Sequence, residues 1–397
     1  MEKIAFPENI KLVLSSLESA GFEAYAVGGC IRDSILGIAP QDWDVTTSAR
    51  PEETMRVFGE NAVPTGLKHG TITVKTPPDA VEVTTFRKDG SYSDHRRPDS
   101  VTFVGSLRED LARRDFTMNA IASPLSGELI DPFGGRKDIE NGVIRCVGEP
   151  DRRFAEDALR MFRALRFSSR LGFEIEKETL DAIYGRAQEA AGLAPERIMS
   201  ELSLMIVCDN VEPVETAFDS GLMDRYVYPG RRIQLSRLRL IPGERLPRLS
   251  GLCAVLARDR RADPEGFLTR LRFDLKTVKT VSAAVGAAMA GLPHTKGGWK
   301  RLICSSGIGT ARCALASSSA LGHEYDDAAL NAIITSGECM SLAELKIGGS
   351  ELGRLGFEGR AIGSELNRLL ERVFDEPELN DREKLLDMAY EDKLNLR

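Results

Sequence analysis

Two aspartates two residues apart, Asp42 and Asp44, lie in a stretch that predicts a strand over 43–47. Because side chains alternate along a strand, both carboxylates would project from one face and could bind divalent cations together. Two Mg²⁺ ions held there would bridge a triphosphate and an attacking hydroxyl group and would stabilise an in-line displacement. Asp-x-Asp by itself more often forms a surface pair. Whether it indicates a metal site therefore depends on the residues around it.

A glycine-rich turn precedes the two aspartates. The segment 28–33 (GGCIRD) joins a predicted strand over 23–27 to a predicted helix over 30–36. Glycine lets the backbone approach a phosphate closely, the start of the helix offers N–H donors, and Arg32 adds positive charge. The sequence therefore predicts a nucleotide-phosphate site beside the Asp pair, with the members Gly28, Gly29, Arg32 and Asp33.

A third carboxylate, Glu82, lies in one of two segments that alternate as half-buried strands do, 71–75 and 80–86, with a turn at 77–79. If Glu82 faces Asp42 and Asp44, it completes the metal site. The alternative is that Glu82 is a simple cross-strand partner of a cation.

Residues 113–120 (RRDFTMNA) place two guanidinium groups, a carboxylate and an amide before an apolar strand. The guanidinium of Arg114 suits phosphate oxygens, while Asp115 and Asn119 could bond ribose hydroxyls. The alternative is a cluster of salt bridges at the start of a helix.

Residues 156–166 (EDALRMFRALR) predict a helix whose apolar stripe faces the core and whose other face carries Glu156, Arg160 and Arg163. Asp157 could accept a hydrogen bond from the amino group of cytosine or adenine, and Arg160 could donate one to a ring nitrogen. Uracil and guanine present the opposite polarity and would leave buried groups unpaired. The alternative is an ordinary ion pair on a helix surface.

The elements that must position these residues fall into two parts. Strand and helix signals alternate up to about residue 148, after which helical patterns dominate over 178–190, 196–207, 267–290, 362–374 and 382–390. Residues Ala158, Met161, Phe162 and Leu165 form one buried helical stripe. The sequence predicts an α+β fold, with a mixed α/β head followed by an all-helical remainder.

The composition of the 397 residues, 42% hydrophobic and 28% charged, is typical of a globular protein. We expect no membrane partner, because no apolar run is long enough to span a bilayer. The absence of a secretory signal and the seven scattered cysteines indicate the cytoplasm.

Charge is unevenly distributed along the chain. The net charge is −7, yet residues 225–301 hold 17 Lys or Arg against five Asp or Glu. This local excess of +12 favours a phosphate-binding surface. The alternative is a solvated, Arg-rich helical surface.

Four of these clusters, in this order, are the glycine turn at 28–33, the pair Asp42 and Asp44, the segment 113–120 and the segment 156–166. Together they resemble the class II tRNA nucleotidyltransferases, which are the bacterial CCA-adding enzymes of the polymerase-β-like superfamily. The resemblance covers roughly residues 20–210 and returns at 345–349 (LKIGG), 356–363 (GFEGRAIG) and 377–382 (PELNDR). It implies template-independent addition of C, C and A to the 3′ end of tRNA from CTP and ATP. It also implies Mg²⁺ as the cofactor and tRNA, not DNA, as the nucleic-acid partner.

The resemblance assigns roles to individual residues. Gly29 and Arg32 would bind phosphates, Asp42 and Asp44 the metal, and Arg114 the ribose and phosphates. Asp157 and Arg160, beside Glu156, would select the base, with Arg163 and Arg166 in support. The family architecture implies a head over 1–148, a neck over 149–210, a body over 211–285 and a tail over 286–397, with tRNA held along the neck, body and tail.

Related activities stay open on the sequence alone. They are a poly(A) polymerase, a CC-adding or A-adding enzyme, and an inactive RNA-binding descendant. CC-adding enzymes have a shortened flexible loop, whereas the corresponding segment 86–98 is full length here, which favours complete CCA addition.

Overall fold

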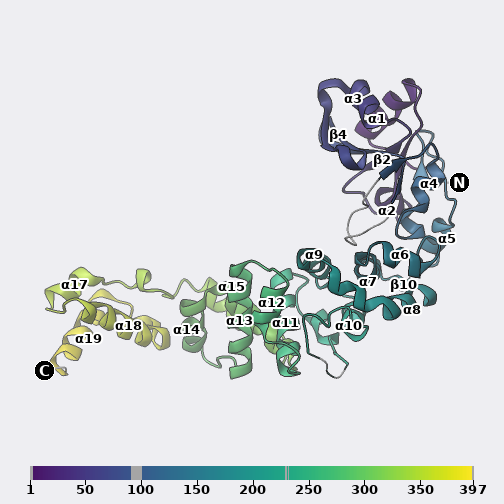
Figure 1. Cartoon of the computed structure of the whole chain (residues 1–397). Helices are drawn as coiled ribbons and strands as arrows, with labels where there is room; N and C mark the ends of the chain where they lie inside the picture. Colours follow the sequence, from purple (N-terminus) through teal and green to yellow (C-terminus); the bar gives the residue numbers. More distant parts are fainter. Residues whose placement is uncertain (1–2, 91–100, 229, 231, 396–397) are drawn as a thin grey trace. The chain divides into compact units, whose positions relative to one another are not determined.

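The computed structural model describes residues 3–90, 101–228, 230 and 232–395. The chain forms two compact units, Met1–Met205 with Glu212–Arg225, and Ile206–Val211 with Tyr226–Arg397 (Figure 1). The predicted α+β class is confirmed, because one mixed sheet lies in the first unit and helices form most of the rest. No helix within the described ranges is both long and apolar enough to cross a membrane.

A six-stranded mixed sheet forms the centre of the first unit, in the order β3-β4-β5-β2-β1-β8. Its strands are β1 (Ala24–Val27), β2 (Asp44–Thr47), β3 (Ala62–Gly66), β4 (Thr71–Thr76), β5 (Asp79–Thr85) and β8 (Ala122–Ser123). Strands β2 and β5 run parallel, and the other neighbours pair antiparallel. The predicted alternation in β4 and β5 is confirmed, since Ile72, Val74, Val81 and Val83 are buried.

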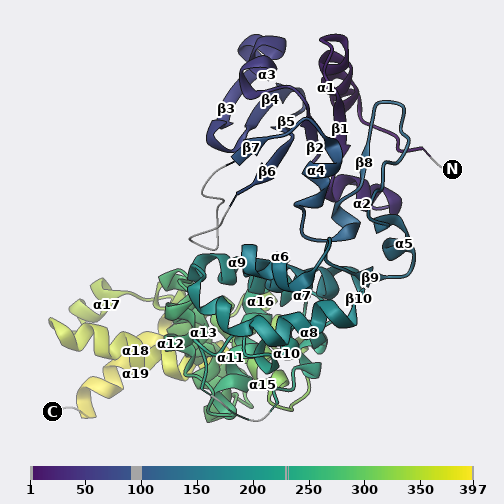
Figure 2. The same ribbon diagram turned by 45° about the vertical axis from the view of Figure 1, so that its right-hand side comes forward.

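Helices α1 (Glu8–Ser19) and α3 (Pro51–Phe58) pack against this sheet (Figure 2). The first unit also contains α2 (Gly29–Ile35), α4 (Leu107–Ala112), α5 (Gly135–Glu140) and two small strand pairs, β6 (Arg87–Asp89) with β7 (Val101–Phe103) and β9 (Val143–Ile144) with β10 (Glu174–Ile175). The full-length loop predicted over 86–98 falls mostly on residues 91–100, which lie outside the described ranges.

The rest of the first unit is helical and comprises α6 (Pro150–Glu156), α7 (Leu159–Leu171), α8 (Lys177–Arg186), α9 (Pro195–Met205) and α10 (Glu212–Asp219). The apolar stripe predicted from Ala158 to Leu165 is confirmed, because its four members are fully buried. The single helix predicted over 156–166 is wrong. Asp157 has extended backbone angles (φ −147°, ψ 104°), and its side chain accepts the backbone N–H of Leu159 at 3.0 Å, so the chain stops one helix and starts another there.

The second unit comprises α11 (Arg245–Arg258), α12 (Pro264–Arg270), α13 (Leu275–Ala290), α14 (Lys296–Ser306), α15 (Ile308–Ala320), α16 (Ala328–Thr335), α17 (Gly349–Arg354), α18 (Arg360–Asp375) and α19 (Arg382–Asn395). Helices α11, α13 and α15 pack against one another. The continuous helix predicted over 267–290 is wrong. Arg272 adopts a left-handed φ of 64°, and Asp274 caps α13 by accepting the N–H of Thr277 at 2.9 Å.

Candidate active site

The predicted glycine turn lies between β1 and α2. Gly28 has a φ of 84°, which L side chains rarely adopt, and a Cβ added there would lie 2.8 Å from Nη1 of Arg114. The backbone conformation therefore favours glycine at position 28, and the guanidinium of Arg114 lies directly against it. The turn brings the 28–33 segment together with the 113–120 segment, which is 80 or more residues away in the sequence.

The predicted metal-binding carboxylates lie at the start of β2. This strand begins at Asp44, one residue later than predicted, so Asp42 lies in the preceding bend and not on the strand. Asp44 is the direct register partner of Glu82 on the parallel strand β5. All three carboxylate side chains are exposed. The parallel register thus places Glu82 beside Asp44.

The electrostatics of Asp44 reflect this crowding. Although its side chain reaches solvent, desolvation by the surrounding protein raises the pKa of Asp44. The guanidinium of Arg114 opposes that effect, while the carboxylates of Glu82 and Asp42 raise the pKa further. A divalent cation would stabilise the charged form, so these residue types suit a metal site. No three His, Cys, Asp or Glu side chains are already grouped as a metal-binding cluster in the described part of the chain.

A cavity of about 400 Å³ unites most of the predicted site residues. Its lining comprises Gly28, Gly29, Cys30, Arg32, Asp33, Gln41, Asp42, Asp44, Arg114, Asp115, Asn119, Arg163, Arg166, Phe167 and Arg170. All the predicted phosphate and ribose contacts are among them, whereas Glu82 is not. Sequence reasoning missed Gln41, Phe167 and Arg170. Of these three, only Arg170 could have been identified from the sequence. It lies four residues after Arg166 on α7 and therefore on the same face of that helix.

Carboxylates and an amide hold the arginines of this cavity in place. Arg32 donates from Nε and Nη2 to Oδ1 of Asp33 at 2.8 and 2.7 Å, and from Nη1 to Oδ1 of Asn119 at 2.6 Å. Arg163 donates to Asp115 at 2.8 Å, and Arg166 to Glu201 at 2.6 Å. These contacts fix the direction of each guanidinium group.

Asp115 is the most strongly held of these carboxylates. Burial raises its pKa, but the positive charge of Arg163 and the hydrogen bonds from Asn119 and Arg163 outweigh burial and lower the pKa to about 2. Its Oδ1 also accepts the backbone N–H of Phe116 at 2.8 Å. Asp115 therefore stays ionised and anchors Arg163 at neutral pH.

A second buried carboxylate, Asp110, was not identified from the sequence. It is fully buried and accepts two hydrogen bonds from Arg113 at 2.9 and 3.0 Å and one from Thr46 of β2 at 3.2 Å. Nη2 of Arg114 lies 3.5 Å from its Oδ2. Asp110 thus links the paired arginines to the strand that begins at Asp44.

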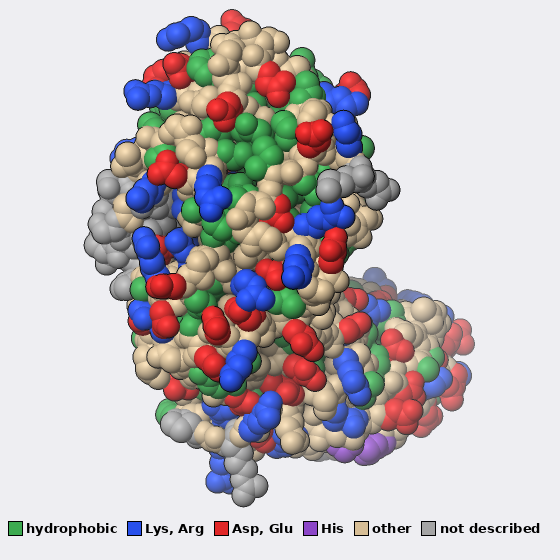
Figure 3. Space-filling view, turned by 90° about the vertical axis from the view of Figure 1, so that its right-hand side faces the viewer, with side chains coloured by type: hydrophobic (Ala, Val, Ile, Leu, Met, Phe, Trp, Pro, Cys, Tyr) green, Lys and Arg blue, Asp and Glu red, His purple; other side chains and the backbone are tan. Residues whose placement is uncertain are grey.

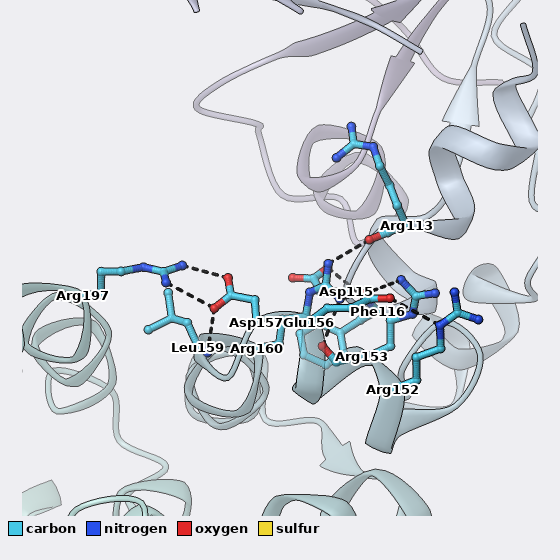
Figure 4. A network of polar contacts seen from close by, with 10 residues as sticks. All are labelled: Arg113, Asp115, Phe116, Arg152, Arg153, Glu156, Asp157, Leu159, Arg160 and Arg197. Atoms are coloured by element: carbon cyan, nitrogen blue, oxygen red, sulfur yellow. Dashed lines mark hydrogen bonds and ion pairs between the residues drawn. The ribbon is translucent and has the colours of Figure 1, made fainter. Parts of the chain in front are cut away.

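The predicted base-selecting residues do not line the cavity. Asp157 accepts two hydrogen bonds from Arg197 of α9, at 3.2 and 2.8 Å (Figure 4). Arg160 is 8% exposed and donates to Glu156 at 2.7 Å and to the backbone carbonyl groups of Arg153 and Arg113 at 3.1 and 3.0 Å. Their roles in base selection stay predictions. Arg197, 40 residues from Asp157, carried no sequence signal for this contact.

The basic stretch 225–301 divides into buried and exposed arginines. Arg248 and Arg261 are almost fully buried and donate to the backbone carbonyls of Ile241 and Tyr228 at 3.0 and 3.1 Å. Exposed side chains in the same stretch include Arg239, Arg245, Arg260, Arg272, Lys276 and Lys279. On the face shown in Figure 3, Lys and Arg side chains are interspersed with Asp and Glu side chains.

Two segments of the chain match family models. Residues 24–145 match the Poly A polymerase head domain, and residues 172–230 match the probable RNA and SrmB-binding site of polymerase A. The first match spans the sheet, the glycine turn and the 113–120 segment, and so contains the head part of the cavity.

Relatives match over nearly the whole length. The chain is 38% identical to a CCA-adding enzyme of Lactiplantibacillus plantarum over 392 residues, which is 96% of this chain and 95% of the relative. It is similar to the crystal structure of the Bacillus stearothermophilus CCA-adding enzyme in complex with CTP, with 30% identity, a TM-score of 0.81 and 98% of each chain covered. It shares its fold with the Thermotoga maritima CCA-adding enzyme complexed with tRNA, with 20% identity, a TM-score of 0.68, and 96% of this chain and 94% of that chain covered.

Proposed function

The chain belongs to the CCA-adding enzymes, and we propose that Asp42 and Asp44 hold the metal ions of the reaction that defines this family. It is a tRNA nucleotidyltransferase, which adds C, C and A to the 3′ end of tRNA from CTP and ATP without a nucleic-acid template. At each addition the oxygen of the RNA 3′-hydroxyl loses its proton to solvent and bonds to the α-phosphorus of the nucleotide, while the bond from the α-phosphorus to the bridging oxygen breaks and pyrophosphate leaves. The observation that carries the residue assignment is the cavity that Asp42 and Asp44 share with five arginines.

The cavity chemistry fits a metal–triphosphate complex. The reaction is metal-dependent, and we propose Mg²⁺, which prefers one or two carboxylates together with substrate phosphate oxygens. When bound, Mg²⁺ would offset the negative charge that develops in the transition state. Among the residues that the structure describes, neither Asp42 nor Asp44 forms an ion pair within 4 Å, so their oxygens are available as ligands. Glu82, the register partner of Asp44, is proposed as a further ligand or as support.

The remaining cavity residues are proposed to hold the nucleotide. Arg32, Arg114, Arg163 and Arg166 would bind the phosphates, while Gly28 and Gly29 let them approach the backbone. Asp115 and Asn119 would accept or donate hydrogen bonds at the ribose. Asp33 would act through Arg32, which it holds at 2.7 Å. Preorganised guanidinium groups cost little reorganisation when charge develops on the leaving pyrophosphate.

Base selection is proposed for Asp157 and Arg160, with Glu156 orienting Arg160. The amino group of cytosine or adenine would donate to Asp157, in exchange for one of the hydrogen bonds from Arg197. A ring nitrogen would accept from Arg160. Uracil or guanine would break the Arg197 contact without replacing it, and leaving the partly buried carboxylate of Asp157 unpaired is costly.

The division into head (1–148), neck (149–210), body (211–285) and tail (286–397) is proposed on the same family basis. The exposed cations of the 225–301 stretch, such as Arg239 and Lys276, are proposed contacts for the tRNA backbone. We also propose that the enzyme works in the cytoplasm, since all seven cysteines are free, as expected in a reducing compartment.

A tRNA lacking its CCA end, incubated with CTP, ATP and Mg²⁺, should grow by three nucleotides. Asp42→Ala and Asp44→Asn should each abolish incorporation while tRNA binding in a filter assay is unchanged. Asp79→Asn, which alters an exposed carboxylate at the start of β5, is the matched control and should retain full activity. Growth of A-tracts would indicate a poly(A) polymerase, and addition of C alone would indicate a CC-adding enzyme. Full activity of Asp44→Asn would contradict the assignment of Asp44 as a metal ligand.

A further inference from the structure

The ring of Phe167 contacts three guanidinium groups of the cavity. The Cζ atoms of Arg32, Arg163 and Arg166 lie 5.0, 5.4 and 4.2 Å from its centroid. All three distances fall within the range in which a cation is attracted to an aromatic ring. Arg32 lies on α2, which follows the glycine turn, whereas Arg163 and Arg166 lie on α7. The Phe167 side chain therefore contacts arginines from two separate helices.

Each of these arginines also has its own acidic partner. Arg32 bonds to Asp33, Arg163 to Asp115, and Arg166 to Glu201. The acidic partners neutralise charge, but each pairs with only one of these three arginines, and the partners lie in three different parts of the chain; Asp33 also lies 3.7 Å from Nη2 of Arg170. The Phe167 ring is the contact that the three cations share, and therefore it sets their spacing relative to one another.

The ring itself is held in place. Phe167 is 4% exposed and packs edge-to-face on Phe116, with ring centroids 5.9 Å apart and an interplanar angle of 86°. Phe116 is fully buried and follows Asp115, whose carboxylate accepts the N–H of Phe116. A rigid ring with two torsion angles between buried neighbours can hold cations with little loss of entropy.

We propose that Phe167 is a positioning residue for nucleotide transfer, which holds Arg32, Arg163 and Arg166 at the spacing required by the triphosphate. The inference rests on the proposed function, because it assumes that these arginines bind phosphate. CTP and ATP carry the same triphosphate, so loss of the ring should weaken both nucleotides equally. The base preference should stay as it is, since Asp157 and Arg160 do not contact the ring.

The test compares Phe167→Leu, which removes the ring, with Phe167→Tyr, which keeps it. Phe162→Leu is the matched control, because Phe162 is fully buried in the same helix and has no cation against its ring within the described contacts. Steady-state kinetics would use tRNA ending in C for CTP and tRNA ending in CC for ATP. The melting temperature of each variant would be recorded alongside.

For Phe167→Leu we expect the KM for CTP and for ATP to rise by a common factor, on the order of tenfold. Phe167→Tyr should restore a KM near that of the wild type, and Phe162→Leu should lower the melting temperature without changing KM. If Phe167→Leu fails to fold, Phe167→Met fills the space without a ring and should give the same rise in KM.

Three outcomes would overturn the inference. These are an unchanged KM in Phe167→Leu and Phe167→Met, an equal defect in Phe167→Tyr, or a rise for one nucleotide only, which would indicate stacking on a base. Failure of the wild-type enzyme to add C and A would instead overturn the proposed function. The two failures are therefore distinguishable.

Discussion

Substitution of Asp115 by Asn tests whether the arginine cluster is anchored as the structure indicates. The side chain of Asp115 is 9% exposed and lies 2.7 Å from Nη2 of Arg163. Asn keeps a carbonyl oxygen that can accept from Phe116 and Asn119, but it places a neutral amide against Arg163. The change therefore removes the charge with little change of shape.

The expected magnitude follows from the pKa of Asp115. Burial alone would raise it, but Arg163 and the hydrogen bonds of Asn119 hold it at about 2, compared with an ordinary value of 3.8. At about 1.4 kcal/mol for each tenfold change in proton affinity, the ionised carboxylate stabilises the folded state by about 2 kcal/mol at neutral pH.

The pH dependence has a defined sign. Because the folded pKa is lowered, the stabilisation is complete above about pH 4, where the unfolded chain also loses its proton. It is lost as the pH falls toward 2, where the folded state binds the proton too. The difference in unfolding free energy between wild type and Asp115→Asn should therefore shrink between about pH 4 and pH 2.

Urea unfolding of the first unit can be followed through Trp43 in a Trp299→Phe background, since Trp43 lies in the first unit and Trp299 in the second. The exposed carboxylate change Asp181→Asn serves as control and should leave stability unchanged at each pH. Equal stability of wild type and Asp115→Asn at pH 7, or a difference that persists to pH 2, would refute the reasoning.

Two further substitutions test the support of the site. Gly135→Ala should destabilise the first unit by about 1–3 kcal/mol in urea unfolding, because the new Cβ would lie 2.0 Å from the carbonyl oxygen of Thr117. The control is Gly105→Ala, whose new Cβ would meet no atom within 4 Å. Equal stability of the two variants would contradict the predicted clash at Gly135. Arg197→Ala should increase incorporation of UTP or GTP relative to CTP in single-nucleotide assays, because Asp157 loses the partner that orients its carboxylate. An unchanged preference would show that Arg197 has no part in base selection.

Local pattern was enough to predict much of the head. Alternation identified β4 and β5, and paired glycines identified the turn before α2. Arg114, Asp115 and Asn119 of the 113–120 segment line the same cavity as that turn. Residues adjacent in the sequence determine the strands and the turn. The alternation of side chains along a strand and the left-handed φ of Gly28 are both set by the local backbone. The N-cap at Asp274 was also local, but the apolar pattern that continues over 267–290 concealed it.

The sequence by itself determined the residue types of the site: carboxylates at 42 and 44, and arginines at 32, 114, 163 and 166. Tertiary structure decided their partners. Arg166 bonds to Glu201 and Asp157 to Arg197, across 35 and 40 residues, and the Phe167 ring lies against Arg32 from another element. The reason is physical. Sequence spacing governs which side chains share a face of one strand or helix, whereas packing between elements decides which charged groups are desolvated together and form ion pairs.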